Sequence, residues 1–248
     1  MQYSESRYPI HDRDEADQLK SLRSIYDDYR AHKFLEELSS DWGSVVFYRG
    51  PGMILAWLLT ATSVTPNMVT TANAFILPCM IAASIFLVPA TAFAVVTVLA
   101  LIYLILDCTD GALARATGLS SNGGHYLDLV TDIAYRGVLY VTVGYIADQI
   151  GASSLPLDQA TVLAVSAWLA TFARLARKDA DRLSDQPART QVPRFTLFSF
   201  LSGIDTVFPI LAFASWSTGY LSAFTLWIFV FSLGDAVTAL IESRTKFS

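Results

Sequence analysis

Four aspartates in the middle of the chain are spaced so that they can form one carboxylate cluster. Asp107 and Asp110 are three positions apart, and Asp128 and Asp132 are four positions apart. Residues with these separations lie on one face of an α-helix, so two neighbouring helices can turn both pairs toward each other. Oxygen ligands in a dense anionic group suit Mg²⁺, Mn²⁺ or Ca²⁺, and two divalent cations would balance the charge. The spacing therefore predicts a centre for divalent cations.

Two other interpretations of these aspartates stay open. The first is a structural network of ion pairs, although the nearby bases Arg115 and Arg136 would leave an excess of negative charge. The second is an ion pathway through a transporter, because acidic residues near the middle of a membrane mark such paths. The second interpretation does not account for the glycines among the acids, Gly111 and Gly124. The adjacent His125 is interpreted as a loop residue rather than as a base.

The helices that carry the aspartates belong to a chain with the composition of a membrane protein. Of its 248 residues, 53% are hydrophobic and 16% are charged, whereas soluble domains carry about 25% charged residues. The 57 residues between Arg49 and Asp107 include no Asp, Glu, Lys or Arg. This composition argues against a soluble enzyme, a disordered chain and, with two cysteines, a secreted disulfide scaffold. A pI of about 5.1 and the lack of a basic patch give nucleic-acid binding no support.

Hydropathy predicts an all-α fold, a polytopic membrane bundle of six transmembrane helices preceded by an interfacial helix. The six expected spans are 68–88, 91–114, 125–147, 158–177, 199–216 and 219–241. They form an expected catalytic domain over 67–243, which is followed by a cytoplasmic C-terminus at 244–248. Each span approaches the length of about 20 residues that a bilayer requires.

The residues before the first span are expected to form two helices that do not cross the membrane. Residues 15–38, within a cytoplasmic tail over 1–49, have the apolar spacing of an amphipathic helix. Its polar face is acidic, so packing on the protein itself is favoured over binding to anionic lipid. The apolar segment 50–64 is too short to span, and an interfacial juxtamembrane helix is expected over 50–66.

The distribution of basic residues predicts the orientation of the spans. Lys and Arg are absent from the alternate loops at 89–90, 148–157 and 217–218. Basic loops face the cytoplasm, so both termini and the loop at 115–124 are expected on that side. The chain is therefore expected to be an integral protein of the plasma (inner) membrane, with its acidic centre open to the cytoplasm.

The segment 107–132 has the sequence DCTDGALARATGLSSNGGHYLDLVTD. It resembles the signature of the CDP-alcohol phosphotransferase family, D-x-x-D-G-x-x-A-R-x8-G-x-x-x-D-x-x-x-D, and matches all eight fixed positions. The chance of such a match is on the order of one in a billion per starting point. The segment 65–70, TPNMVT, also resembles the one that opens the first span in many members. The resemblance implies transfer of a phospho-alcohol from a CDP-alcohol donor to a hydroxyl acceptor, with release of CMP.

The resemblance also implies roles for single residues. Four aspartates would hold two divalent cations, Mg²⁺ or Mn²⁺ with Ca²⁺ as an alternative occupant: Asp107, Asp110, Asp128 and Asp132. Asp132 would in addition act as the catalytic general base. Seven residues would bind CDP: Asn67, Thr70, Asp110, Gly111, Ala114, Arg115 and Gly124. The family further suggests a homodimer in the lipid bilayer.

Four basic residues are candidates for binding the acceptor: Arg136, Arg174, Arg177 and Lys178. They could form an anion pocket for a phosphorylated acceptor. For Arg177 and Lys178 the alternative is the ordinary basic flank of a span. Members that make inositol-phosphate lipids resemble this chain around 123–128, but their basic residue does not occupy the position of Arg136. The identity of the acceptor therefore stays open.

Two classes of function follow from these patterns. The first is a membrane enzyme, with CDP-diacylglycerol as the leading donor and CDP-choline, CDP-inositol or CDP-glycerol types as alternatives. The second is a cation-binding membrane protein or a transporter that uses the same acids. Asp205 and Asp235, in or near the last two expected spans, receive no assigned role.

Overall fold

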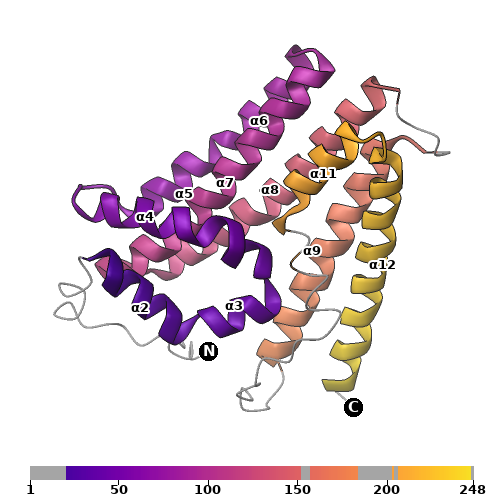
Figure 1. Ribbon diagram of the computed structural model, residues 1–248. Helices are drawn as coiled ribbons and strands as arrows, with labels where there is room; N and C mark the ends of the chain where they lie inside the picture. Colours follow the sequence, from indigo (N-terminus) through magenta and orange to yellow (C-terminus); the bar gives the residue numbers. More distant parts are fainter. Residues whose placement is uncertain (1–20, 152–156, 184–202, 204–205, 247–248) are drawn as a thin grey trace.

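The structure is a computed structural model that describes residues 21–151, 157–183, 203 and 206–246. Within these ranges the regular elements are all helical, as the sequence predicts. Four helices precede the bundle: α2 (Leu22–His32), α3 (Phe34–Ser40), the π-helix η1 (Ser44–Tyr48) and α4 (Arg49–Thr60). The bundle has seven described helices: α5 (Pro66–Ala74), α6 (Ile76–Phe86), α7 (Pro89–Thr117), α8 (Asn122–Gln149), α9 (Gln159–Leu183), α11 (Phe208–Ser217) and α12 (Leu221–Lys246). Figure 1 shows α9 and α12 side by side, with α2 and α3 at one end of the molecule.

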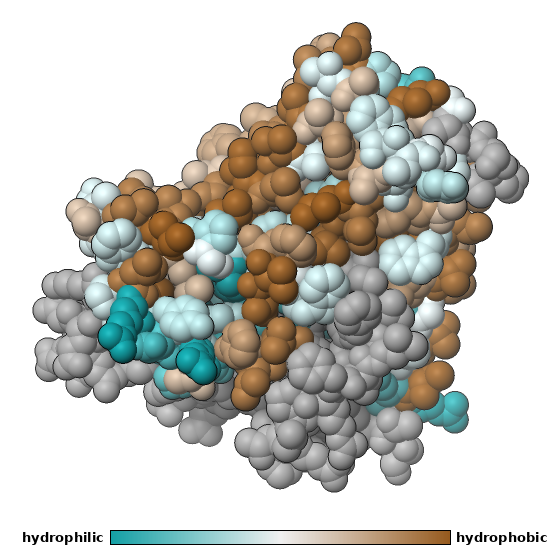
Figure 2. Space-filling view, in the orientation of Figure 1, coloured by the Kyte–Doolittle hydropathy of each residue, from teal (hydrophilic) through white to brown (hydrophobic). Residues whose placement is uncertain are grey.

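Four described segments are long and apolar enough to cross a membrane: Pro66–Phe86, Pro89–Thr117, Gln159–Arg177 and Leu221–Arg244. They correspond to the first, second, fourth and sixth expected spans. Apolar side chains cover much of the face of the bundle seen in Figure 2, and hydrophilic ones gather near α2. The chain is thus an integral membrane protein with apolar helices.

The third and fifth expected spans do not stand out as candidates among the described residues. Helix α8 has 28 residues, which is sufficient length, but it carries the charges of Asp128, Asp132 and Arg136. Helix α11 is apolar and has only 10 residues, and most of 199–205 lies outside the described part of the chain. The described residues therefore establish four candidate spans rather than six.

The first expected span is divided into α5 and α6 at Phe75. The Phe75 N–H donates to the carbonyl of Ala72, three residues back, at 3.2 Å. Pro78 follows three residues later. A proline has no N–H to donate to the carbonyl four residues before it, and its ring clashes with that carbonyl. Pro78 therefore explains why the helix is interrupted at this position.

The N-terminal region packs on the bundle through one face of α2. The expected helix over 15–38 is divided near Lys33 into α2 and α3, and residues 15–20 lie outside the described part. Ser21 begins α2 with a capping box, in which the Ser24 N–H donates to Ser21 Oγ at 3.1 Å. Ile25 and Tyr29 are buried in a cluster with Leu113 of α7. The amphipathic face thus packs against the protein itself.

Close approaches between helix backbones hold α7 and α8 in place. A Cβ atom on Gly52 of α4 would lie 2.7 Å from Cys108 Cβ of α7. A Cβ atom on Gly144 of α8 would lie 2.5 Å from Ala160 Cα of α9. Real Cβ atoms do not come this close, so each glycine permits a contact that no larger residue would allow. Two helices that carry the predicted site are therefore each fixed by a neighbour.

Candidate metal centre and donor site

Three of the predicted aspartates form a compact group between α7 and α8. Asp107, Asp110 and Asp128 each offer one carboxylate oxygen, and these oxygens all lie within 4.8 Å of one another. Two oxygens bound to opposite sides of one Mg²⁺ or Ca²⁺ ion are about 4–5 Å apart. The three oxygens are hard ligands at a separation that fits such an ion, so the arrangement could hold a divalent cation.

The connection between α7 and α8 brings these aspartates together. Gly118 ends α7 with a φ of 66°, in the left-handed region that favours glycine. Ser121 then begins α8, and its hydroxyl oxygen accepts a hydrogen bond from the Gly124 N–H at 3.0 Å. The short connection leaves the two helices antiparallel, so the last turns of α7 face the first turns of α8.

Burial and mutual repulsion make this group costly without a cation. Asp110 is 6% exposed, and Asp107 and Asp128 are partly buried. The Asp107 carboxylate is repelled by those of Asp132, Asp110 and Asp128. The Thr70 hydroxyl donates to Asp110 Oδ2 at 2.6 Å, which stabilises one of these negative charges. Like charges held this close favour a divalent cation among them.

Asp132, the fourth predicted aspartate, has a different partner. Arg174 Nη2 of α9 donates to Asp132 Oδ2 at 3.2 Å. Asp132 lies one turn beyond Asp128 on α8 and is near enough to repel Asp107. Its side chain is 21% exposed, and that of Arg174 is 50% exposed. Asp132 is thus an oriented carboxylate at the edge of the group formed by Asp107, Asp110 and Asp128, called the metal group below.

The small residues of the signature lie against open space or in close contacts. Among the described residues outside the backbone of its own helix, a Cβ atom on Gly111 would meet only Arg115 Nη1, at 3.6 Å. A Cβ atom on Gly124 would lie 2.7 Å from Asn67 Oδ1. Gly124 therefore permits the Asn67 side chain at the start of α5 to reach α8. Ala114 lies between Gly111 and Arg115 on α7 and is partly buried.

Arg115 has a partner that the sequence analysis did not assign. Its Nε atom lies 3.6 Å from Asp28 Oδ2 on α2. Asp28 follows Ile25 by three positions, next to the buried face of α2. The sequence does show an acidic residue at the border of the apolar face of this helix, which indicates that the residue lies near a packing contact. The sequence does not show which helix this face contacts.

The four candidate acceptor residues divide into separate environments. Arg177 is engaged by α12: its guanidinium contacts Asp235 Oδ1 at 2.6 Å, Glu242 Oε2 at 2.9 Å and Thr238 Oγ1 at 3.0 Å. Arg136 is partly buried on α8. The structure describes neither Asp205 nor the side chain of Lys178.

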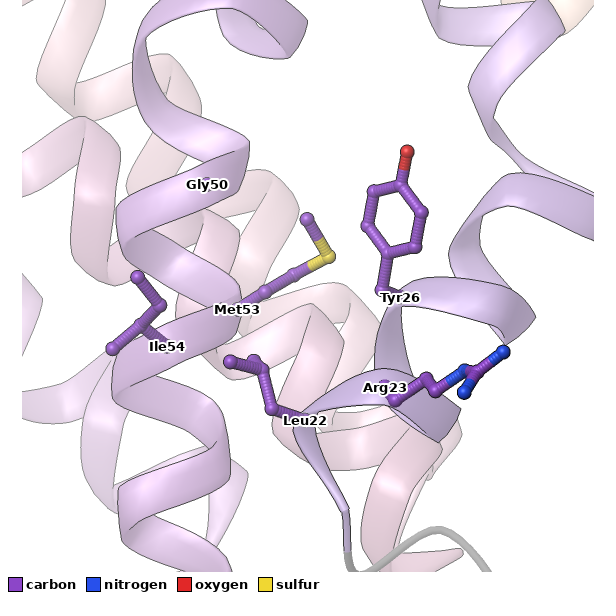
Figure 3. A pocket seen from close by; sticks show the side chains of 6 residues that line it. All are labelled: Leu22, Arg23, Tyr26, Gly50, Met53 and Ile54. Atoms are coloured by element: carbon purple, nitrogen blue, oxygen red, sulfur yellow. The ribbon is translucent and has the colours of Figure 1, made fainter.

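A cavity of about 540 Å³ lies elsewhere, between α2 and α4 (Figure 3). Six residues line it: Leu22, Arg23, Tyr26, Gly50, Met53 and Ile54. None of these six described residues carries a carboxylate or another anionic ligand, so the cavity does not resemble a cation site.

The family model for CDP-alcohol phosphatidyltransferase matches residues 63–234, more than two thirds of the chain. No curated protein matches the chain. The matched region begins after α4 and includes the acid cluster, Gly111, Arg115 and Arg174. The chain therefore belongs to the CDP-alcohol phosphatidyltransferase family, which confirms the family predicted from the signature. Members are metal-dependent membrane transferases of phospholipid biosynthesis, in class EC 2.7.8, that move a phospho-alcohol from a CDP-alcohol donor.

Proposed function

We propose that the chain transfers the phosphatidyl group of CDP-diacylglycerol to a hydroxyl acceptor and releases CMP. The group of Asp107, Asp110 and Asp128 carries this proposal, because three oxygens within 4.8 Å, in the matched region, suit a divalent cation. In the reaction the acceptor oxygen bonds to the phosphatidyl phosphorus. The bond from that phosphorus to the CMP oxygen breaks, and CMP leaves with the electron pair.

The carboxylate ligands support binding of two divalent cations, Mg²⁺ or Mn²⁺, by Asp107, Asp110, Asp128 and Asp132. When bound, such cations neutralise the charge that develops on the attacking and leaving oxygens of a phosphoryl transfer. The Thr70 hydroxyl donates a hydrogen bond to Asp110 Oδ2 at 2.6 Å and so orients this carboxylate. Side chains around this metal group are proposed to supply the general base and to bind the donor and the acceptor.

Asp132 is proposed as the general base. A neutral hydroxyl is a weak nucleophile, and a positioned base accelerates such reactions by about 10²–10⁴-fold. The Asp132 carboxylate would accept the acceptor's proton on one oxygen. The contact of its Oδ2 with Arg174 Nη2, at 3.2 Å, supports this role because it fixes the orientation of the carboxylate. The proton then leaves the site through solvent, since Asp132 is partly exposed.

The face of α7 formed by Gly111, Ala114 and Arg115 is proposed to bind the CDP part of the donor. The space above Gly111 supports close approach of a nucleotide to the helix backbone. The Arg115 guanidinium can bind phosphate oxygens with two donors. Asn67 and Gly124 contact each other at the same end of the bundle, which supports a role for both beside the nucleotide.

The acceptor is proposed to bind near Arg136 and Arg174, on the Asp132 side of the metal group. Arg174 is half exposed, so an anionic acceptor can reach its guanidinium. The dense contacts of Arg177 with α12 favour a structural role for that residue. Lys178 is also proposed to bind the acceptor, and this proposal rests on the sequence alone.

The membrane topology is proposed to have six spans, with α8 as the third and the segment ending in α11 as the fifth. The length of α8, 28 residues, supports this because about 20 residues suffice. Basic loops would then place both termini and the metal group in the cytoplasm. The plasma (inner) membrane and a homodimer belong to the same proposal.

A CMP-release assay with purified protein tests the function. We expect Mg²⁺- or Mn²⁺-dependent CMP release from CDP-diacylglycerol and a mixture of acceptor alcohols, and none in EDTA. Release from CDP-choline, CDP-inositol or CDP-glycerol instead would keep the family reaction but replace the donor. A protein that binds metal but releases no CMP from any donor would favour cation binding or transport.

A further inference from the structure

We propose that Asp28 of α2 is a positioning residue that orients the Arg115 guanidinium for the CDP donor. This inference rests on the proposed role of Arg115 in binding the donor phosphates. Helix α2 precedes the residues matched by the family model, which begin at residue 63. The N-terminal region of this chain would therefore supply a part of the donor site that lies outside the matched region.

The packing of α2 brings Asp28 to the end of α7 that carries Arg115. Ile25 and Tyr29 are 4% and 3% exposed, and they belong to one apolar cluster with Leu113 and Ala116 of α7. Asp28 lies beside them on α2, three positions after Ile25. The buried face of α2 thus determines where the Asp28 carboxylate meets α7.

The two ends of the Arg115 guanidinium have different surroundings. Nε lies 3.6 Å from Asp28 Oδ2. Nη1 is the atom nearest to the open space above Gly111, 3.6 Å from the position of a Cβ there. A guanidinium is planar and rigid, so a carboxylate at one edge fixes the direction of the other edge. Asp28 therefore directs Arg115 toward the space proposed for the donor.

Asp28 is itself held in position, as this role requires. Its side chain is 12% exposed, and its Oδ1 lies 3.1 Å from His32 Nδ1. Each oxygen of the carboxylate thus faces a different nitrogen, one on α2 and one on α7. The free rotation that an exposed aspartate would keep is restricted.

A second ion pair fixes α2 relative to α4. The Tyr29 hydroxyl donates to Glu37 Oε2 at 2.9 Å, and Arg49 Nε donates to the same oxygen at 2.7 Å. Burial, together with the adjacent Glu37 carboxylate, raises the pKa of the Tyr29 phenol, so it stays a donor at neutral pH. Arg49 and Arg115 repel each other, and Glu37 offsets this by neutralising Arg49. These contacts hold α2, which carries Asp28, against α4.

The test measures the affinity of full-length protein for CDP in the presence of Mg²⁺, by calorimetry. CDP is the probe because it is common to all CDP-alcohols and contains the phosphates. We expect Asp28→Asn to weaken CDP binding about tenfold, with the same increase in donor KM and little change in kcat. Asp28→Glu is expected to restore part of the affinity.

Asp27→Asn is the matched control. Asp27 is the neighbouring aspartate, 64% exposed, and pairs with Arg23 on the surface of α2 at 3.8 Å. The Asp27→Asn variant should bind CDP as the wild type does. In an Arg115→Ala background, Asp28→Asn should have no further effect on CDP affinity, because Asp28 acts through Arg115. The melting temperature of each variant is measured in parallel.

Equal CDP affinity in wild type and Asp28→Asn would overturn the inference, while CMP release by the wild type would leave the proposed function standing. Tighter CDP binding in Asp28→Asn would also overturn it, since Asp28 would then compete with the donor for Arg115. An undiminished effect of Asp28→Asn in the Arg115→Ala background would show a general structural role instead. A wild type that binds CDP but releases no CMP would remove the proposed reaction and keep the positioning role.

Discussion

Two groups of charged residues beside α9 are built in opposite ways. Between α9 and α12, Arg177 contacts two carboxylates and the Thr238 hydroxyl, so positive and negative groups meet directly. Between α7 and α8, three carboxylates face one another within 4.8 Å. In the first group Arg177 contacts both carboxylates and balances one of them, and Glu242 is 54% exposed, whereas the three carboxylates of the second group leave a larger excess of negative charge.

This difference separates structural charges from functional ones. A compensated group inside a membrane protein holds two helices together and needs no ligand. A group with excess charge is expensive to bury and is retained where a ligand completes it. The same reasoning separates Arg177 from Arg174, because Arg177 contacts two carboxylates, whereas Arg174 contacts Asp132 and is half exposed.

The largest effect is expected for Asp107→Asn. Loss of one carboxylate from the metal group should reduce metal-dependent CMP release below detection. The matched control is Asp235→Asn, which removes a carboxylate from the α9–α12 group and should keep most of the wild-type rate. Activity in Asp107→Asn equal to that in Asp235→Asn would remove the distinction between the two groups.

Asp132→Asn should lower kcat by about 10²–10⁴-fold, the usual contribution of a general base. CDP affinity should stay near that of the wild type, because the amide keeps the shape of the side chain. Single-turnover kinetics and calorimetry with CDP separate these two quantities. A wild-type kcat would exclude Asp132 as the base.

Gly111→Leu should weaken CDP binding by tenfold or more, on the order of what a lost close contact costs. Among the described residues, and apart from the backbone of its own helix, the atom that a Cβ at this position would meet is Arg115 Nη1, at 3.6 Å, so the fold should tolerate the change. Gly234→Leu on α12, where a Cβ would meet nothing within 4 Å, is the control. Unchanged CDP affinity in Gly111→Leu would place the nucleotide elsewhere.

The smallest effect on activity is expected for Arg177→Met. This change leaves Asp235 without its 2.6 Å partner and should lower the free energy of unfolding by about 1–3 kcal/mol. Thermal unfolding in detergent measures this loss, and kcat and both KM values should change less than twofold. A raised acceptor KM with unchanged stability would return Arg177 to the acceptor site.

The sequence predicted the local part of the site better than its long-range contacts. Helical spacing places Asp107 and Asp110 on one face and Asp128 on a neighbouring helix, so their meeting follows from a short connection. The partner of Arg115 is Asp28, 87 positions away, and that of Asp132 is Arg174. Such pairs depend on how helices pack, which periodicity within one helix does not determine.

The fold shows the same limit. Hydropathy located the apolar helices, but it gave one continuous span where Pro78 divides α5 from α6. It also did not identify the partners of Arg177 and Arg174, which lie on one helix and contact α12 and α8, respectively. Local pattern defines elements, and the partners of their side chains come from tertiary packing.

Binding of Mn²⁺ to the purified protein tests whether the group of Asp107, Asp110 and Asp128 holds a divalent cation. Electron paramagnetic resonance would compare the wild type, Asp107→Asn and Asp235→Asn at equal protein concentration. We expect the wild type and Asp235→Asn to bind Mn²⁺ alike and Asp107→Asn to lose this binding. Equal Mn²⁺ binding in all three proteins, or none in the wild type, would contradict a cation site at Asp107, Asp110 and Asp128.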